Sequence, residues 1–245
     1  MEHIWTFFAF PLNLIFAIIW FGGWMWLWKG RSDSRIVKFM LSPAATISAI
    51  VLLLAACLWI GFSGSREFVQ SLPFVAVLLY LQTVVFLVTL RGWRRADGDV
   101  RWRFLLIHAG LLLALGSGFW GAPDSCEMRV ALSEGESSAK AYFMDGRLSG
   151  LGYELQLADC KVETSVDGKP SYYEAWVSVD GVEPVSITVN HPHSVHFGED
   201  IYLASVTESG CVLQIVREPW RYFALAGILM LLAGAFMLFI KGPRR

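Results

Sequence analysis

Five long apolar runs, each nearly free of charged residues, constrain this chain more than any other feature of its sequence. They cover about residues 4–28, 44–62, 72–90, 101–120 and 222–240. A run of about 20 apolar residues forms a helix long enough to cross the roughly 30 Å hydrocarbon core of a bilayer. With 55% hydrophobic residues, 17% charged residues and a mean hydropathy of +0.50, the chain is too apolar for an ordinary soluble domain. The runs therefore predict an α-helical polytopic membrane protein with five transmembrane helices.

The basic residues of the loops predict the orientation of these helices. Residues 29–38, 91–103 and 241–245 contain four, five and three Lys or Arg residues, which is twelve of the 20 in the chain, whereas residues 63–71 contain only Arg66. Cytoplasmic loops of membrane proteins carry an excess of Lys and Arg. We therefore predict a multi-pass protein of the bacterial inner membrane with its N-terminus outside and its C-terminus in the cytoplasm. The first run lacks a basic start and a small-residue cleavage site, so we do not interpret it as a signal peptide.

The only long polar segment, residues 122–220, lies between the fourth and fifth runs and is expected to form one extracytoplasmic antiparallel β domain. Its best predicted strands cover about residues 153–164, 171–179, 185–190, 201–206 and 211–216. Apolar and polar residues alternate along them, so one face of the sheet should be buried, either inside a sandwich or against the membrane helices. The predicted division is a four-helix transmembrane region at 1–121, the β domain, and a C-terminal helix with a basic tail at 221–245.

Local signals in the β segment predict two tight turns and one irregular strand. Asp167-Gly168 and Asp180-Gly181 stand between predicted strands, and this dipeptide favours a hairpin. The apolar phase changes near Asp159, which predicts a bulge. The neighbouring acids Glu199 and Asp200 are interpreted as a solvent-exposed turn rather than as an acid/base pair.

The four cysteines indicate neither a zinc knuckle nor a redox dithiol, because no Cys-x-x-Cys occurs. Cys57 lies in an apolar run and is expected to be a small buried hydrophobic residue. Cys126, Cys160 and Cys211 lie in the β segment, where an oxidising compartment would permit disulfides. Their pairing stays open, and we expect at most one disulfide among them within one chain.

One histidine, His108, lies inside the fourth run, five residues after Arg103. An ionisable group in the membrane is costly and by default marks a functional site, and neutral imidazole is a common ligand of haem iron. The helical rise places His108 in the cytoplasmic half of the membrane. Haem ligation, a hydrogen bond to a neighbouring helix and proton relay are all open roles. Because no other run contains a histidine, a bis-histidine haem site would need a ligand from another chain.

Three further histidines, His191, His193 and His196, follow a predicted strand end. Their spacing matches no standard metal site and lacks a cysteine or carboxylate partner, so no metal site is predicted. They are candidates for contact with a substrate or partner, or they are solvated or capping residues. The catalytic residues stay unknown, because the chain has no serine-hydrolase, nucleotide-binding or metalloprotease motif. It also has no Cys-x-x-Cys-His, so it is not itself a c-type cytochrome, and its net charge of −1 does not indicate a nucleic-acid partner.

Several stretches together resemble a known family. Residues 104–111 contain the histidine and a glycine and lead through 121–124 into the polar segment. Residues 189–202 contain Val-Asn-His-Pro followed by a Gly and an Ile-Tyr pair, and residues 216–227 contain Glu-Pro at the start of the last run and then a glycine. In this order they resemble the ResB-like family of system II cytochrome c biogenesis. Pro-Leu-Asn at 11–13 resembles a short form known from Bacteroidetes-type members.

The resemblance implies a membrane subunit of a system II cytochrome c synthase. Such proteins act with a CcsA-like partner that carries a tryptophan-rich haem-handling motif. Together they bind and export haem and support its thioether attachment to Cys-x-x-Cys-His apocytochromes. The resemblance implies that His108 is an axial ligand of haem b, held transiently and shared with the partner. It also implies that the catalytic motif of this lyase-type complex lies in the partner chain, with a thiol-reducing thioredoxin-like protein as a further partner.

Two other interpretations stay open. One is a membrane assembly or anchor protein whose β domain binds a partner without contacting haem. The other is a b-type haem subunit of a quinone-linked reductase.

Overall fold

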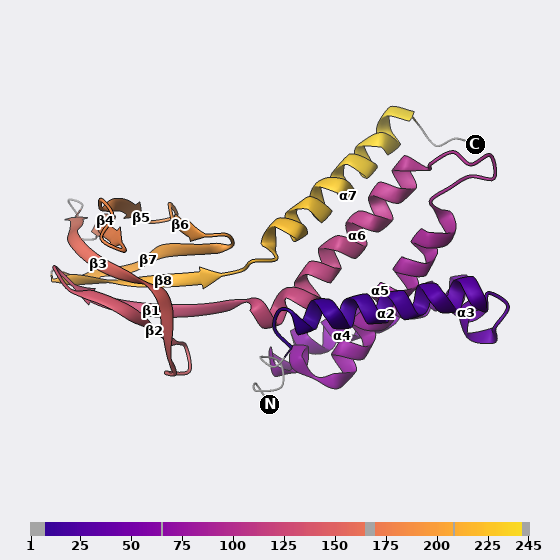
Figure 1. Ribbon diagram of the computed structural model, residues 1–245, viewed down its shortest axis with the longest axis horizontal. Coiled ribbons are helices and arrows are strands. Elements are labelled where there is room, and N and C mark those ends of the chain that lie inside the picture. Colours follow the sequence, from indigo (N-terminus) through magenta and orange to yellow (C-terminus); the bar gives the residue numbers. More distant parts are fainter. Residues whose placement is uncertain (1–7, 65, 165–169, 208, 242–245) are drawn as a thin grey trace. The chain divides into compact units, whose positions relative to one another are not determined.

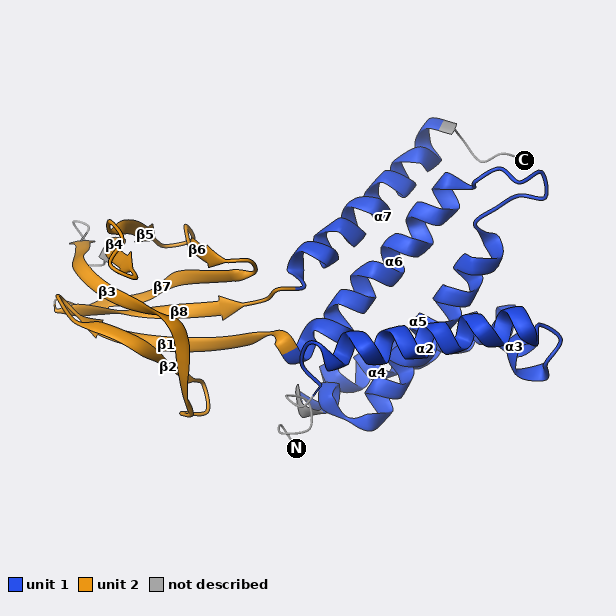
Figure 2. Cartoon of the chain, in the orientation of Figure 1, with its two compact units in different colours: residues 1–123, 220–245 blue, residues 124–219 orange. Residues whose placement is uncertain are grey.

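The chain folds into a helical unit and a β-sheet unit. The structure is a computed structural model that describes all residues except 1–7, 65, 165–169, 208 and 242–245 (Figure 1). Residues 1–123 and 220–245 form the helical unit, and residues 124–219 form the β unit (Figure 2). Five membrane-length apolar helices and one eight-stranded antiparallel sheet are present, so the predicted fold class is confirmed.

Five helices of the helical unit are long and apolar enough to cross a membrane. They are α2 (Leu12–Gly30), α4 (Pro43–Ser63), α5 (Leu72–Gly92), α6 (Trp102–Gly121) and α7 (Arg221–Lys241). The last four agree with the predicted spans to within the one or two residues by which assigned helix ends vary. The first, α2, begins directly after Pro11, a residue tolerated at a helix start but not in its interior. The predicted part of this span before residue 8 lies outside the described residues.

Short helices occupy three of the connections. They are α3 (Arg35–Met40), η1 (Arg66–Gln70) and η2 (Ala122–Asp124). The basic stretch 29–38 is expected from its sequence to be a loop, but α3 begins there because the Ser34 hydroxyl accepts a hydrogen bond from the Val37 amide at 3.2 Å.

The interior of the helical unit is built around α5, the helix with the largest buried share. Small residues of α4 face it, with Ala45 and Ala49 fully buried. Cys57 of α4 is exposed, so the prediction of a buried residue is wrong. In a membrane helix an apolar position can face lipid instead of protein, and hydropathy does not distinguish the two.

The helices α6 and α7 run side by side (Figure 1) and approach closely at glycines. A Cβ atom placed on Gly110 would lie 2.8 Å from the carbonyl oxygen of Gly227, and one placed on Gly227 would lie 2.6 Å from the backbone nitrogen of Ala114. Small residues let membrane helices pack backbone to backbone, where van der Waals contact stabilises the pair. These glycines therefore set the distance between α6 and α7.

Replacing Gly227 by alanine should separate the two helices, because the new methyl group would meet backbone atoms that cannot rotate away. We expect the free energy of unfolding of the helical unit to fall by about 1–3 kcal/mol. Unfolding of the full chain in mixed micelles, followed by circular dichroism, measures this. Gly118→Ala is the matched control, since nothing lies within 4 Å of a Cβ at Gly118. Equal losses in the two variants would contradict the close packing.

The β unit is a single antiparallel sheet with the strand order β5-β4-β3-β2-β1-β8-β7-β6. Its strands are β1 (Cys126–Ser133), β2 (Ser137–Phe143), β3 (Leu148–Thr164), β4 (Pro170–Val179), β5 (Val185–Thr188), β6 (His193–His196), β7 (Glu199–Thr207) and β8 (Gly210–Arg217). The predicted strands correspond to β3, β4, β5, β7 and β8, whereas β1, β2 and β6 were not predicted. One hydrophobic core draws residues from seven of the eight strands, among them the fully buried Leu155, Val177, Ile187, Leu213 and Ile215.

The local signals of the β unit have mixed outcomes. The bulge predicted near Asp159 is present, because the β3–β4 register shifts between Leu157 and Asp159. Asp180 and Gly181 both have positive φ, 51° and 73°, as at the centre of a type I′ turn, and the Val182 amide donates to the Val179 carbonyl at 3.0 Å. The connection from β4 to β5 is nevertheless longer than a two-residue hairpin, because residues 180–184 separate the strands. The second predicted turn, Asp167-Gly168, lies outside the described residues.

The interpretation of Glu199 and Asp200 as an exposed turn is wrong. They are only 3% and 4% exposed and begin β7. Their carboxylates are buried because each has a partner, Arg217 and Tyr153 for Glu199 and the Ser194 hydroxyl for Asp200. Buried charges are tolerated where they are paired and hydrogen-bonded.

Candidate functional site

His108 lies on α6 with its ring held on one side. Its Nδ1 is 2.9 Å from the carbonyl oxygen of Phe104, one helical turn earlier. The two rings are stacked, with centroids 3.9 Å apart and an interplanar angle of 24°. The Phe104 ring in turn packs against Gly92, where an added Cβ would lie 2.5 Å from it. The imidazole is therefore oriented by its own helix and by a ring that α5 holds in place.

This hydrogen bond determines which nitrogen of His108 is available. A carbonyl oxygen can only accept, so Nδ1 must carry the proton, and in a neutral imidazole Nε2 then has a free lone pair. Within the described part of the chain, Nε2 has no hydrogen-bond partner. Metal-bound histidines commonly donate their other ring N–H to a carbonyl in this way, which fixes the tautomer and the ring plane. The geometry of His108 thus suits a ligand of haem iron through Nε2.

A tryptophan-lined cavity of about 850 Å³ lies elsewhere in the helical unit, bordered by α2, α5 and the end of α6. Its wall includes Trp20, Trp24, Trp26, Trp120 and Asn13. This cavity was not predictable from the sequence, because its wall is assembled from three helices distant in sequence. Its volume is that of a ligand pocket.

Buried polar residues connect the helices behind this cavity. The Asn13 amide donates to the Trp120 carbonyl at 2.7 Å, and the Trp120 indole N–H donates to Gln82 Oε1 at 3.0 Å. The Trp20 indole donates to the Thr83 hydroxyl at 2.9 Å. Inside a membrane each such bond satisfies a group that lipid could not. These bonds therefore fix α2 and α6 against α5.

The three histidines of the β unit do not converge on one point. His193 is half-buried on β6, whereas His191 and His196 are exposed. His196 packs edge-to-face on Tyr153, with ring centroids 5.5 Å apart. Among the described residues, no group of three or more His, Cys, Asp or Glu side chains could hold a metal ion.

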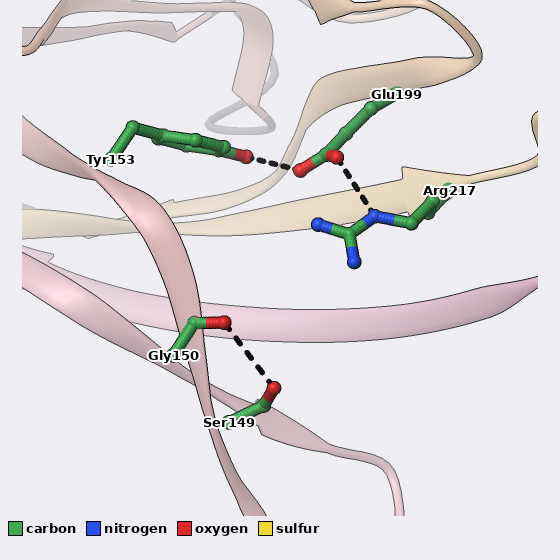
Figure 3. Close-up of polar contacts among 5 residues, drawn as sticks. All are labelled: Ser149, Gly150, Tyr153, Glu199 and Arg217. Carbon is green, nitrogen blue, oxygen red and sulfur yellow. Dashed lines mark hydrogen bonds and ion pairs between the residues drawn. The ribbon is translucent and has the colours of Figure 1, made fainter.

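Next to these histidines lies a buried polar network that sequence analysis missed (Figure 3). The Tyr153 hydroxyl donates to Glu199 Oε1 at 2.6 Å, and Arg217 Nε donates to Glu199 Oε2 at 2.8 Å. Burial and the bond to Glu199 raise the pKa of Tyr153 well above its usual value, so the phenol stays protonated and acts as a donor. The network joins β3, β7 and β8. Its residues were missed because they lie far apart in the sequence.

The structure pairs none of the four cysteines in a disulfide. Burial raises the pKa of Cys126, and burial and nearby carboxylates raise that of Cys160. Burial and the neighbouring Cys160 raise the pKa of Cys211 to about 11. Since the thiolate is the nucleophile, all three thiols are poorly reactive at neutral pH.

Alkylation of Cys211 should therefore be slow at pH 8 and should accelerate as the pH rises towards about 11. A pKa raised from 9.0 to about 11 lowers the thiolate fraction at pH 8 by about 100-fold. Mass spectrometry of the full chain after timed iodoacetamide exposure measures the rate at each cysteine. The unfolded chain is the control, and equal rates for Cys211 in folded and unfolded protein at pH 8 would contradict the structure.

The stretches that carry the sequence resemblance meet within each unit. In the helical unit Gly110 of the first stretch contacts Gly227 of the third. In the β unit a Cβ on Gly198 of the second stretch would lie 2.5 Å from Pro219 Cα of the third. Glu199 and Arg217 join the same two stretches. The residues that looked scattered along the chain therefore build two contact sites.

Fold and site together define a multi-pass membrane protein that carries a β domain between its last two helices and one histidine in a membrane helix. The model of the ResB-like family matches residues 100–212. This region of the chain therefore resembles the ResB-like family, as the sequence resemblance predicted.

Other comparisons add the following. The solved structure of a protein named cytochrome c haem lyase CcmF is similar, with 14% sequence identity and a TM-score of 0.41. The similarity covers 94% of this chain and 46% of that chain, so the present chain spans less than half of the length of that protein. No curated protein matches the chain.

Proposed function

We propose that the chain is the membrane subunit of a system II cytochrome c synthase. With a CcsA-like partner it binds haem, exports it and supports its thioether attachment to Cys-x-x-Cys-His apocytochromes. Haem b is the cargo of this reaction, held transiently. The observation that carries the proposal is the imidazole of His108, whose Nδ1–H is donated to the Phe104 carbonyl while Nε2 remains free. The match of residues 100–212 to the ResB-like family supports the same function.

The residues around His108 fit a haem ligand. The stacked Phe104 ring keeps the imidazole plane fixed, and the residue is only half-buried. The described membrane helices contain no second histidine. We therefore assign the opposite axial ligand to the CcsA-like partner, which makes the haem shared. When bound, haem supplies the vinyl groups that become thioethers, and this chain holds the iron and orients the ring.

The other parts of the proposal concern location and partners. The chain lies in the bacterial inner membrane with its N-terminus outside, and the β unit faces the apocytochrome. The exposed His191 and His196 and the half-buried His193 are candidates for contact with the apocytochrome or the partner. The raised pKa values of Cys126, Cys160 and Cys211 disfavour this chain as the reductant of apocytochrome thiols. A thioredoxin-like protein is therefore assigned that step.

The haem absorption spectrum of the purified chain, with and without its co-expressed partner, tests the proposal. We expect a low-spin haem b spectrum in the complex and little haem in the chain alone. Stoichiometric haem in the chain alone would favour the b-type haem subunit of a reductase. A stable complex without haem that still promotes maturation would favour an assembly or anchor protein.

A further inference from the structure

A second cavity of about 350 Å³ lies at the start of α6, beside the ring that stacks on His108. Three arginines, Arg95, Arg101 and Arg103, line it together with Phe104 and with Met237 of α7. The cavity is therefore basic on one side and apolar on the other. Phe104 belongs both to its wall and to the His108 stack.

The charges of this basic cavity are not compensated within the described residues. Arg95, Arg101 and Arg103 form no ion pair there, and Asp97 and Asp99 of the same loop are not among the lining residues. Arg101 is nevertheless fixed in position. One of its terminal nitrogens donates to the Gly92 carbonyl at 3.3 Å, and its guanidinium lies over the Phe104 ring at 4.8 Å. Such a group is oriented before a ligand arrives, which lowers the entropy cost of binding.

We propose that this basic cavity binds the propionate carboxylates of haem whose iron is held by His108. The inference rests on the proposed function and deepens it by naming the residues that bind the carboxylate edge of haem. Guanidinium groups bind carboxylates through paired, charge-assisted hydrogen bonds. Arg101, Phe104 and His108 follow one another along one side of α6 at helical spacing. A haem ligand therefore meets cations at its carboxylate edge and an imidazole at its iron.

Phosphate groups of anionic lipids offer similar chemistry and are the competing ligand. Arginines at the cytoplasmic end of a membrane helix often contact headgroups. The cavity favours a propionate because Phe104 and Met237 form its apolar side, which suits a porphyrin edge better than a hydrated headgroup. Haem and its dimethyl ester separate the two ligands, since they differ only in the free carboxylates.

The test compares binding of ferric haem b and of its dimethyl ester to the full chain in phosphatidylcholine nanodiscs, with and without the co-expressed partner. We expect wild type to bind haem more tightly than the ester. The triple variant Arg95→Gln, Arg101→Gln, Arg103→Gln should lose about 10- to 100-fold in haem affinity and keep its ester affinity. Arg94→Gln is the matched control, because Arg94 stacks on Trp93 and does not line the cavity.

The outcomes separate this inference from the proposed function. If wild type binds neither compound in either preparation, the proposed function fails and the inference with it. If wild type binds both equally, or the triple variant keeps the preference for haem, the propionate inference is overturned while the proposed function stands. The propionate inference would also be overturned if native mass spectra showed that the triple variant loses bound anionic lipid while its preference for haem is unchanged. If the glutamine variant fails to insert into the membrane, the triple variant with lysines replaces it, because lysines preserve the charges that set the topology. The lysine variant should lose part of the preference for haem over the ester.

Discussion

Replacing His108 by alanine should remove most of the haem from the complex with its partner and lower the yield of mature cytochrome c by about tenfold or more. The iron would lose an axial ligand that the Phe104 carbonyl orients, while the helix and its contacts would remain. The measurement is the haem content of the purified complex per protein, together with cytochrome yield in the same cells. His108→Cys should retain some haem, since thiolate is also an axial ligand.

Two controls distinguish ligation from a structural role of His108. The complex should still assemble in His108→Ala, and dissociation would favour a hydrogen-bonding role instead. Gly118→Ala adds a methyl group to the same helix at a position where nothing lies within 4 Å of the new Cβ, and it should leave haem content unchanged. Unchanged haem and cytochrome yield in His108→Ala would refute the proposed ligand.

The second large effect is expected at Arg217. Arg217→Met leaves the Glu199 carboxylate, whose side chain is 4% exposed, without its cation. Removing one partner of a buried ion pair costs about 3–5 kcal/mol, because the remaining charge stays desolvated. The Arg217 side chain is itself 38% exposed, so we expect the lower end of this range. Thermal unfolding of the β unit in the full chain, followed by near-ultraviolet circular dichroism, measures the loss.

A double variant and a surface control make this prediction specific. Glu199→Gln combined with Arg217→Met removes both charges and should recover most of the lost stability. Arg147→Met breaks an ion pair with Asp145 whose side chains are 51% and 36% exposed, and it should change stability by less than about 1 kcal/mol. A double variant as unstable as Arg217→Met alone would contradict the role of the ion pair.

The helices and most strands were predictable because their signals are local. Hydropathy over about 20 residues determines a membrane span, and alternation determines a strand face. Even the bulge at Asp159 was predictable, because the alternation of apolar and polar residues changes its phase there. The strand β2 was missed because its alternation is weak, whereas β1 was missed although its residues alternate between buried and exposed. The helix α3 was missed because it contains the charges that also mark a loop.

The site could be predicted only where its partners are near in sequence. His108 was found because a histidine in an apolar run is rare, whereas its stacking partner Phe104 was not predicted, although it lies only one helical turn earlier. Glu199 was misread because its partners, Tyr153 and Arg217, lie 46 and 18 residues away. The cavity lined by Trp20 and Trp120 likewise depends on helix packing, which hydropathy does not encode.

The pairing of β1 with β8 has a consequence for how this protein can be altered. The two strands pair from Cys126 opposite Arg217 to Ser133 opposite Gly210. The start and the end of the β unit therefore lie next to each other. A segment with adjacent ends behaves as a cassette that can be exchanged or enlarged without displacing what flanks it. Residues 124–219 can thus diverge in sequence while the membrane helices keep theirs.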